Sequence, residues 1–145
     1  MSAGRVCSRV VATASPVETV RVAAQRMAEH GVGTLVVVNP DRNNQAIGVT
    51  TDRDIAIRCV AAGLDPEHTP VTGVMTSPAQ TIDQDTPIET AVARMANTAT
   101  RRLVVTGEGR RLVGILSLDD IVDLLAEEAG SIGRLLQKQR PRIPA

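Results

Sequence analysis

The sequence contains no phenylalanine, tyrosine or tryptophan. Modules that bind single-stranded nucleic acid stack the bases on aromatic rings, and arginine is the only side chain here that could replace them. The 16 Lys and Arg residues are balanced by 16 Asp and Glu residues, so the formal net charge is zero. Nucleic acids and anionic membranes both select a net basic surface. We therefore expect no nucleic-acid partner and no membrane partner.

Cysteine and long apolar runs are also scarce. Cys7 and Cys59 are the only cysteines; they form no disulfide framework, and we interpret them as buried thiols rather than as a redox pair. The purely apolar runs are a few residues long, far short of the roughly 20 that cross a bilayer. No secretory signal is recognisable, so we expect a cytoplasmic protein. Val, Ala, Ile and Leu suffice for an aliphatic core.

An internal repeat organises the chain. A displacement of 68 residues places residues 6–37 on residues 74–105 without a gap. After a turn that is two residues shorter in the second copy, the displacement becomes 66, and Gly48 to Ile55 then fall on Gly114 to Ile121. The two halves are therefore copies of one structural unit.

Each copy predicts the element order β-α-β-β-α. Spacing of i, i+3, i+4, i+7 predicts one buried helical stripe per copy, at Val20, Ala23, Ala24 and Met27 and at Ile88, Ala91, Val92 and Met95. Apolar runs between turn residues predict two hairpins, Thr34 to Val38 with Ala46 to Thr50 and Arg102 to Thr106 with Leu112 to Leu116. A second helix should follow in each copy and end at a glycine, Gly63 or Gly130.

Two helix starts can be examined in more detail. Thr86-Pro87-Ile88-Glu89 predicts Thr86 as the N-cap and Pro87 as the first helical residue. Ser15-Pro16-Val17-Glu18 has the same pattern three residues earlier in the repeat. The first helix therefore either starts a turn sooner or leaves Pro16 in the preceding loop.

These patterns predict an α+β fold. One copy has too little apolar surface to be stable alone, so we expect the two to pack sheet to sheet with pseudo-twofold symmetry and matched crevices between them. The expected units are residues 5–63 and 74–130, joined by a linker at 64–73 and followed by a C-terminal helix and loose tail at 131–145. The tail is basic and broken by proline from Lys138 onward. Ile132, Leu135 and Leu136 share one helical face, which we interpret as core or dimer contact.

The junction between the last strand and the last helix of each copy carries the sharpest motif. Thr51 and Asp54 occupy it in the first copy, and Ser117 and Asp120 in the second. One interpretation is a capping box, in which hydroxyl and carboxylate serve only the helix start. The other is a nucleotide site, because a helix N-terminus and a hydroxyl suit phosphate while a carboxylate can accept two ribose hydroxyls. The residues alone leave both interpretations open.

Two βαββα copies, each ending in Gly-hydrophobic-x-[Ser/Thr]-x-x-Asp-Ile, resemble the CBS domain family in its paired form, the Bateman module. The resemblance covers residues 5–130, and Val74-Met75-Thr76 and Arg102 to Val105 also match it. It implies that Asp54 and Asp120 bind ribose and that Thr51 and Ser117 bind phosphate. It implies that adenine meets the entry strand and the first hairpin strand, at residues 10–13 and 34–36 in the first copy and at 79–82 and 103–104 in the second. Within these ranges we select Val11, Thr13, Thr34, Leu35, Val36, Thr81, Ile82, Leu103 and Val104 as contacts.

The resemblance also assigns phosphate contacts to basic residues before the first hairpin strand. Arg101 and Arg102 match in the second copy, although a solvated strand end is an equal alternative. The first copy has Gly33 and Thr34 at these positions. We therefore expect two unequal crevices.

The functional hypothesis is a non-enzymatic regulatory module that binds an adenine nucleotide or adenosyl ligand as a homodimer. AMP, ADP or ATP is favoured over NAD or S-adenosylmethionine, with no obligatory cofactor, and an unknown effector protein could be its target. His30 and His68 lack supporting ligands, so no metal site is expected. The alternative is a ligand-free structural dimerisation module. A fragment of a larger enzyme is disfavoured because no nucleophile–base set or catalytic segment is recognisable.

Overall fold

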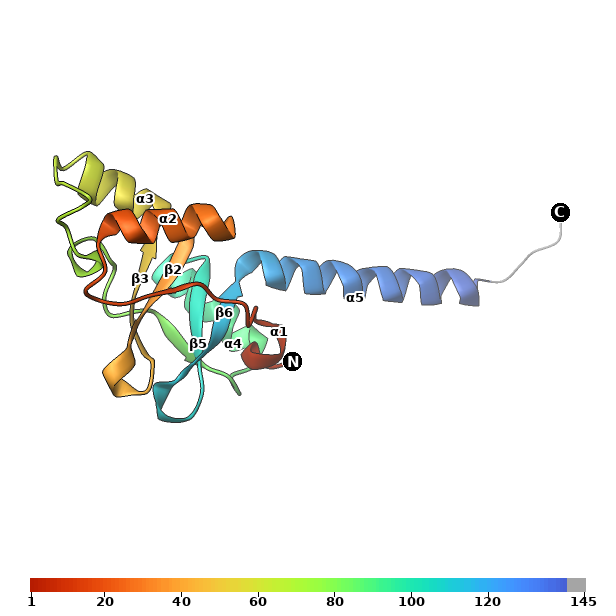
Figure 1. Cartoon of the computed structure of the whole chain (residues 1–145). Coiled ribbons are helices and arrows are strands. Elements are labelled where there is room, and N and C mark those ends of the chain that lie inside the picture. The colour runs from red at the N-terminus through yellow and green to blue at the C-terminus, as the bar shows by residue number, and fades with distance from the viewer. Residues whose placement is uncertain (141–145) are drawn as a thin grey trace.

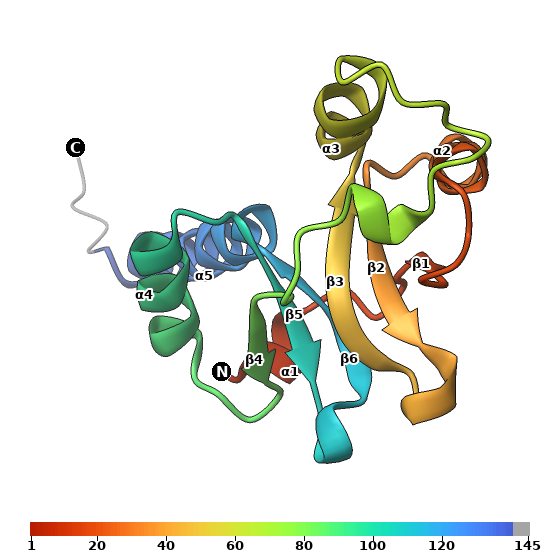
Figure 2. The same cartoon turned by 90° about the vertical axis from the view of Figure 1, so that its left-hand side faces the viewer.

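The computed structural model describes residues 1–140 and contains two three-stranded sheets packed against each other (Figures 1 and 2). The first sheet comprises β1 (Thr13–Ala14), β2 (Thr34–Asn39) and β3 (Gln45–Thr51), and the second β4 (Thr81–Asp83), β5 (Arg102–Thr106) and β6 (Leu112–Ser117). In each sheet the first strand is parallel to the middle strand, and the third is antiparallel to it. The α+β fold and both predicted hairpins are therefore confirmed.

Helices cover the outer face of each sheet (Figure 2). The first sheet carries α2 (Val20–His30) and α3 (Asp52–Ile55), which continues as the π-helical turn η2 (Ala56–Val60). The second carries α4 (Ile88–Thr98) and the first turn of α5 (Leu118–Gln139). Four shorter helices complete the structure: α1 (Ala3–Val6), η1 (Pro40–Arg42), η3 (Val71–Gly73) and η4 (Glu108–Arg110). The predicted stripes are buried at Val20, Ala23 and Met27 and at Ile88, Ala91 and Met95. The prediction is wrong for Val92, which is exposed, and Ala24 is only partly buried.

The inner faces of the two sheets form a shared aliphatic core. Val36 and Val38 of β2 and Val104 of β5 are buried together, and Val49 and Ile115 pack against them. Val36 pairs with Val49 in one sheet, and Val104 pairs with Ile115 in the other. Equivalent repeat positions therefore meet across the pseudo-twofold axis, as the sheet-to-sheet prediction requires.

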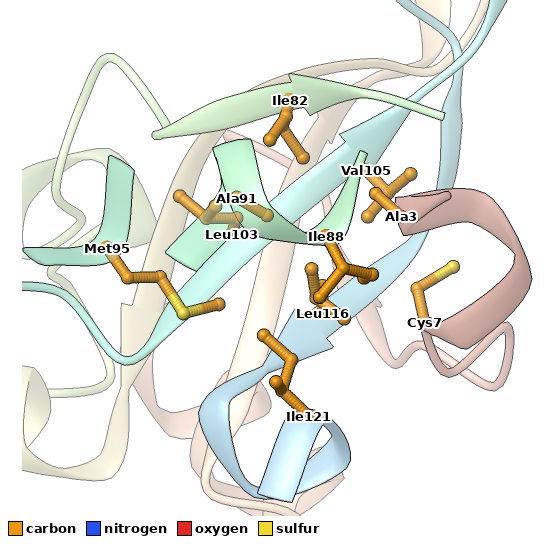
Figure 3. Close-up of a cluster of buried hydrophobic side chains, with 10 residues drawn as sticks. All are labelled: Ala3, Cys7, Ile82, Ile88, Ala91, Met95, Leu103, Val105, Leu116 and Ile121. Atoms are coloured by element: carbon orange, nitrogen blue, oxygen red, sulfur yellow. The ribbon is translucent and has the colours of Figure 1, made fainter. Parts of the chain in front are cut away.

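The entry segments of the two copies are exchanged. Ala3 of α1 and Cys7 belong to the core of the second copy, together with Ile82, Ile88, Ala91, Met95, Leu103, Val105, Leu116 and Ile121 (Figure 3). Conversely, Val71, in the segment expected to be a linker, is fully buried in the core of the first copy, and Val74 packs there against Val20 and Cys59. Each copy therefore completes the other, which explains why neither would be stable alone.

The same exchange caps the first helix of each copy. The Val20 amide donates to the Thr69 carbonyl at 2.9 Å, and the Ile88 amide donates to the Met1 carbonyl at 3.1 Å. Pro87, not Thr86, is the N-cap of α4 and no side chain caps that helix, so the predicted Thr86 cap is wrong. Pro16 lies in a turn before the Thr19 N-cap of α2, which settles the alternative left open by the sequence.

The two glycines expected to end the last helices behave differently. Gly63 adopts a φ of +74° just after η2, as a helix-terminating glycine does. The prediction for Gly130 is wrong, because α5 runs through it as one helix of 22 residues. A glycine inside a helix costs about 1 kcal/mol relative to alanine, which does not by itself stop a helix. Lys138 is therefore helical, and the rest of the expected loose tail, residues 141–145, lies outside the described residues.

Both cysteines are buried free thiols, so the structural interpretation of them is confirmed. Desolvation by burial raises the pKa of Cys7, and this opposes formation of the reactive thiolate. None of the helices within residues 1–140 has the length and apolar content that a membrane span needs.

Gly114 is required by the close approach of the exchanged entry segment. Ser8 and Ile115 exchange backbone hydrogen bonds of 2.9 and 3.0 Å, so the chain crosses directly over Gly114. A Cβ atom at Gly114 would overlap the Ser8 carbonyl oxygen and lie 2.7 Å from Cys7 Sγ. We expect Gly114→Ala to lower the free energy of unfolding by about 1–3 kcal/mol, measured by urea denaturation.

Gly133→Ala is the matched control, because nothing lies within 4 Å of a Cβ atom at that position in α5. Alanine there should be neutral or stabilising, since it is the better helix former. Equal stability of wild type and Gly114→Ala would contradict the close approach of the entry segment.

Candidate functional site

Both hydroxyl–carboxylate motifs form complete capping boxes. The Asp54 amide donates to Thr51 Oγ1 at 3.1 Å, and the Thr51 amide donates to Asp54 Oδ2 at 2.9 Å. The equivalent bonds between Asp120 and Ser117 are 3.1 and 3.0 Å long. The capping interpretation of these residues is therefore correct in both copies.

The capping role leaves part of each motif free for a ligand. Each box occupies one carboxylate oxygen, Oδ2, and uses the hydroxyl only as an acceptor. Asp54 Oδ1 faces Arg58 Nε at 3.9 Å, and the Asp54 side chain keeps 17% of its surface exposed. A carboxylate oxygen can still accept hydrogen bonds and the hydroxyl can still donate one. Because the capping box fixes the side-chain rotamers, it holds the carboxylate and the hydroxyl in place and leaves both able to bind a ligand.

Asp54 lines a cavity of about 210 Å³ between the two sheets, which we call the Asp54 crevice. Its walls come from both copies: Thr34, Val49, Thr51 and Asp54 from the first, and Thr76, Ala79, Gln80, Thr100, Arg101, Arg102, Leu103, Val104 and Ile115 from the entry and body of the second. The motif of the first copy therefore faces the basic pair of the second. The sequence placed Arg101 and Arg102 in the second copy without showing which carboxylate they would accompany.

Asp120 lines the pseudo-symmetric cavity, of about 280 Å³, which we call the Asp120 crevice. Val32, Gly33 and Thr34 stand there in the repeat positions that Thr100, Arg101 and Arg102 occupy in the Asp54 crevice. Ser117, Val11 and Arg102 also contribute to its walls. It therefore contains one arginine, where the Asp54 crevice contains two.

Neither arginine is committed to a strong partner. Arg101 Nη2 lies 3.4 Å from Asp119 Oδ1, but the two side chains are 72% and 79% exposed. Exposed pairs of this kind contribute between nothing and about 1 kcal/mol. The Arg102 guanidinium makes no ion pair with any of residues 1–140. Both side chains can therefore turn toward an anion in the crevice at little cost.

The structure places the predicted adenine contacts unevenly. Thr34, Leu103 and Val104 line the Asp54 crevice, and Val11 and Thr34 line the Asp120 crevice. Five predicted residues line neither: Thr13, Leu35, Val36, Thr81 and Ile82. Leu35, Val36 and Ile82 are buried in the hydrophobic clusters instead. Leu35 points to the outer face of its sheet, under α2, and Val36 points to the inner face but is covered there by Val104 of the other sheet.

Two polar wall residues, Thr76 and Thr100, were missed by the sequence analysis, whereas Gln80 lies in the range 79–82 expected to meet adenine. Thr76, Gln80 and Thr100 line the Asp54 crevice, opposite the Thr51–Asp54 motif. They lie 22 or more residues from that motif, and only the packing of one copy on the other brings them near it. The exchanged entry segment, which supplies Thr76 and Gln80, was the missing information.

A larger cavity than either crevice lies elsewhere, with a volume of about 550 Å³ between residues 10–15 and α2. Its one arginine, Arg26, is held by Glu18 at 2.6 Å and by the Thr13 carbonyl at 2.7 Å. No motif residue lines it, so its size alone does not make it a nucleotide site. Among residues 1–140, no group of three or more His, Cys, Asp or Glu side chains is arranged to hold a metal ion.

Two curated relatives span most of this chain. An uncharacterized protein of Methanopyrus kandleri is 35% identical over 124 residues, which is 86% of this chain and 62% of that protein. This chain therefore spans less than two thirds of that relative's length. Hypoxic response protein 1 of Mycobacterium tuberculosis is 37% identical over 112 residues, 77% of this chain and 76% of that protein.

Solved structures show the same fold. The crystal structure of Hypoxic Response Protein I with two coordinated zinc ions has a TM-score of 0.75 and 32% identity, covering 85% of this chain and 98% of that one. A CBS domain protein from Pyrobaculum aerophilum complexed with AMP has a TM-score of 0.74 and 28% identity, covering 83% of this chain and 89% of that one. The CBS domain family matches this chain twice, over residues 3–60 and 71–127. The chain therefore belongs to the CBS domain family and is a tandem CBS pair.

Proposed function

We propose that this CBS pair is a regulatory module, without catalysis of its own, that senses an adenine nucleotide bound in the Asp54 crevice. The observation that carries the proposal is the meeting of Thr51 and Asp54 with Arg101 and Arg102 in one cavity. The structural neighbour that is complexed with AMP supports an adenosyl ligand.

Each part of the crevice matches one part of a nucleotide. The carboxylate of Asp54 is held by its cap and accepts hydrogen bonds from the ribose hydroxyls. The Thr51 hydroxyl and the two guanidinium groups donate to phosphate, and bidentate arginine–phosphate contacts are among the stronger protein hydrogen bonds. Val49, Ala79 and Ile115 provide the aliphatic walls for adenine that aromatic residues would otherwise supply.

We expect the size of the crevice to favour a small adenosyl ligand. Its volume of about 210 Å³ lies below the roughly 300–1,000 Å³ of typical small-molecule sites. A mononucleotide therefore fits better than a dinucleotide such as NAD. Two arginines beside it also favour a phosphorylated ligand over the cationic S-adenosylmethionine, so AMP is the first ligand to test, before ADP and ATP.

A ligand-free structural dimerisation module is the second candidate. The intact capping boxes favour it, because helix capping alone accounts for both motifs. Under this alternative, Asp54 and Asp120 contribute stability and no binding.

Calorimetric and thermal-shift titrations with AMP, ADP, ATP, NAD and S-adenosylmethionine separate the two candidates. A nucleotide at 100 times its Kd should raise the free energy of unfolding of wild type by about 2.7 kcal/mol. The double variant Asp54→Ala/Asp120→Ala should lose this effect. Asp52→Ala is the control, since Asp52 lies in the same helix turn but lines neither crevice. If no ligand binds wild type better than the double variant, the sensing proposal fails and the structural module stands.

A further inference from the structure

The C-terminal helix α5 leaves the body of the molecule and projects away from it (Figure 1). Ile121, in its first turn, is its one buried residue. Five of its large aliphatic side chains are more than half exposed: Val122 53%, Leu125 57%, Ile132 59%, Leu135 54% and Leu136 57%. Leu118 instead packs against the core of the second copy, and Leu124 is half-buried. Residues expected to be core or dimer contact thus meet no core in this chain.

A projecting helix of this composition is poorly stabilised by itself. Its 22 residues extend over about 33 Å at 1.5 Å per residue. Gly130 and Gly133 lie inside it, and each costs about 1 kcal/mol relative to alanine. Most helix stability in proteins comes from packing of an apolar face. The exposed face of α5 therefore needs a partner.

The spacing of the apolar residues specifies what kind of partner it is. Positions 122, 125, 129, 132 and 136 carry Val, Leu, Ala, Ile and Leu, with intervals that alternate between three and four residues. This period of 3.5 is the heptad pattern of a coiled coil, in which each apolar residue inserts between residues of a facing helix. The narrow seam therefore fits another helix rather than a broad groove or a bilayer surface.

The charges along α5 specify which helix, and in which direction. Every charged residue from position 118 to 128 is acidic: Asp119, Asp120, Asp123, Glu127 and Glu128. Every charged residue from 129 to 140 is basic: Arg134, Lys138 and Arg140. A second α5 laid parallel would place acid beside acid, whereas an antiparallel one places each acidic half beside a basic half. Complementary charge of this kind fixes register and orientation between partners.

We propose that α5 pairs with α5 of a second copy of this chain as an antiparallel two-stranded coiled coil. In this register Leu125 packs against the partner's Leu136, and Ala129 packs against the partner's Ile132. A small residue thus faces a large one near the crossing point. The proposal does not depend on nucleotide binding.

Sedimentation equilibrium tests whether α5 pairs with a second copy of this chain. Wild type should be a dimer, and Leu125→Glu/Ile132→Glu should raise its dissociation constant at least about 100-fold, because each charge would be buried in the seam. Ser131→Glu/Gln137→Glu adds the same charge outside the seam and should remain dimeric. Methyl NMR spectra of the sheet core should be unchanged in both variants, which excludes unfolding as the cause. A monomeric wild type, or a dimer that survives Leu125→Glu/Ile132→Glu, would overturn the proposal.

Cysteine cross-linking tests the direction. A mixture of Leu125→Cys and Leu136→Cys proteins should oxidise to a mixed disulfide dimer, since these positions face each other in the antiparallel pair. Leu136→Cys alone should not cross-link, whereas in a parallel pair it would meet itself. Wild type, whose Cys7 and Cys59 are buried, is the control. Efficient cross-linking of Leu136→Cys alone would refute the antiparallel arrangement, and neither experiment reads out nucleotide binding.

Discussion

Asp54→Ala should weaken AMP binding by about 10- to 100-fold, because a hydrogen bond to a charged group contributes about 1.5–3 kcal/mol. Asp120→Ala should leave the affinity within about two-fold of wild type if AMP occupies the Asp54 crevice. The two variants should differ because two arginines line the Asp54 crevice, whereas only Arg102 lines the Asp120 crevice. Calorimetric titration of the two single variants with AMP measures this difference in affinity.

The two variants serve as controls for each other. Asp54 and Asp120 occupy equivalent positions in the capping boxes of the two copies, and the hydrogen-bond lengths in the two boxes agree within 0.1 Å. Loss of a helix cap costs about 1 kcal/mol, and we expect this loss to be similar in both proteins before any ligand is added. An effect on AMP affinity that is equal in the two variants, or larger for Asp120→Ala, would contradict the assignment of the Asp54 crevice.

Arg101→Ala/Arg102→Ala should reduce the affinity for AMP by about 100-fold, because it removes both charge-assisted contacts to the phosphate. Adenosine, which has no phosphate, should bind wild type and this variant about equally well. The salt dependence of AMP binding should also become shallower, since fewer charges take part. Parallel titrations with AMP and adenosine at two salt concentrations provide the measurement.

The matched control for this pair is Arg110→Ala/Arg111→Ala. It makes the same change in net charge in the turn of the same hairpin, and neither residue lines a crevice. This control distinguishes a local phosphate contact from a general effect of surface charge. If AMP affinity falls equally in the two double variants, or if adenosine loses as much affinity as AMP, the phosphate role of Arg101 and Arg102 is wrong.

Much of the fold could be predicted from the sequence because its signals are local. The apolar runs and turn residues located both hairpins to within a residue or two, since strand and turn propensities act over short distances. The exchange of α1 and η3 could not be predicted. Ala3 and Val71 lie in segments too short for a periodic pattern, and their burial depends on how two distant copies pack. Gly130 was misjudged because one glycine lowers helix stability by about 1 kcal/mol without ending the helix, and the good helix formers at 134–139 continue it.

In the candidate site, too, some residues could be predicted from local sequence signals and others could not. Thr51 and Asp54 were identifiable because their geometry is fixed within one helix turn. The proximity of Arg101 and Arg102 to Asp54 is a product of the pseudo-twofold packing, and no local pattern reports it. Strand alternation directs Leu35 and Ile82 to the outer faces of their sheets, under the helices, whereas Val36 points inward and is buried against Val104 of the other sheet.

A crystal structure of the protein grown with saturating AMP tests the central proposal most directly. We expect one nucleotide in the Asp54 crevice, with its ribose hydroxyls on Asp54, its phosphate beside Thr51, Arg101 and Arg102, and adenine between Val49 and Ile115. Nucleotide density beside α2 in the larger cavity, or only in the Asp120 crevice, would contradict the proposal. So would an empty Asp54 crevice at a concentration of AMP that stabilises the protein in solution.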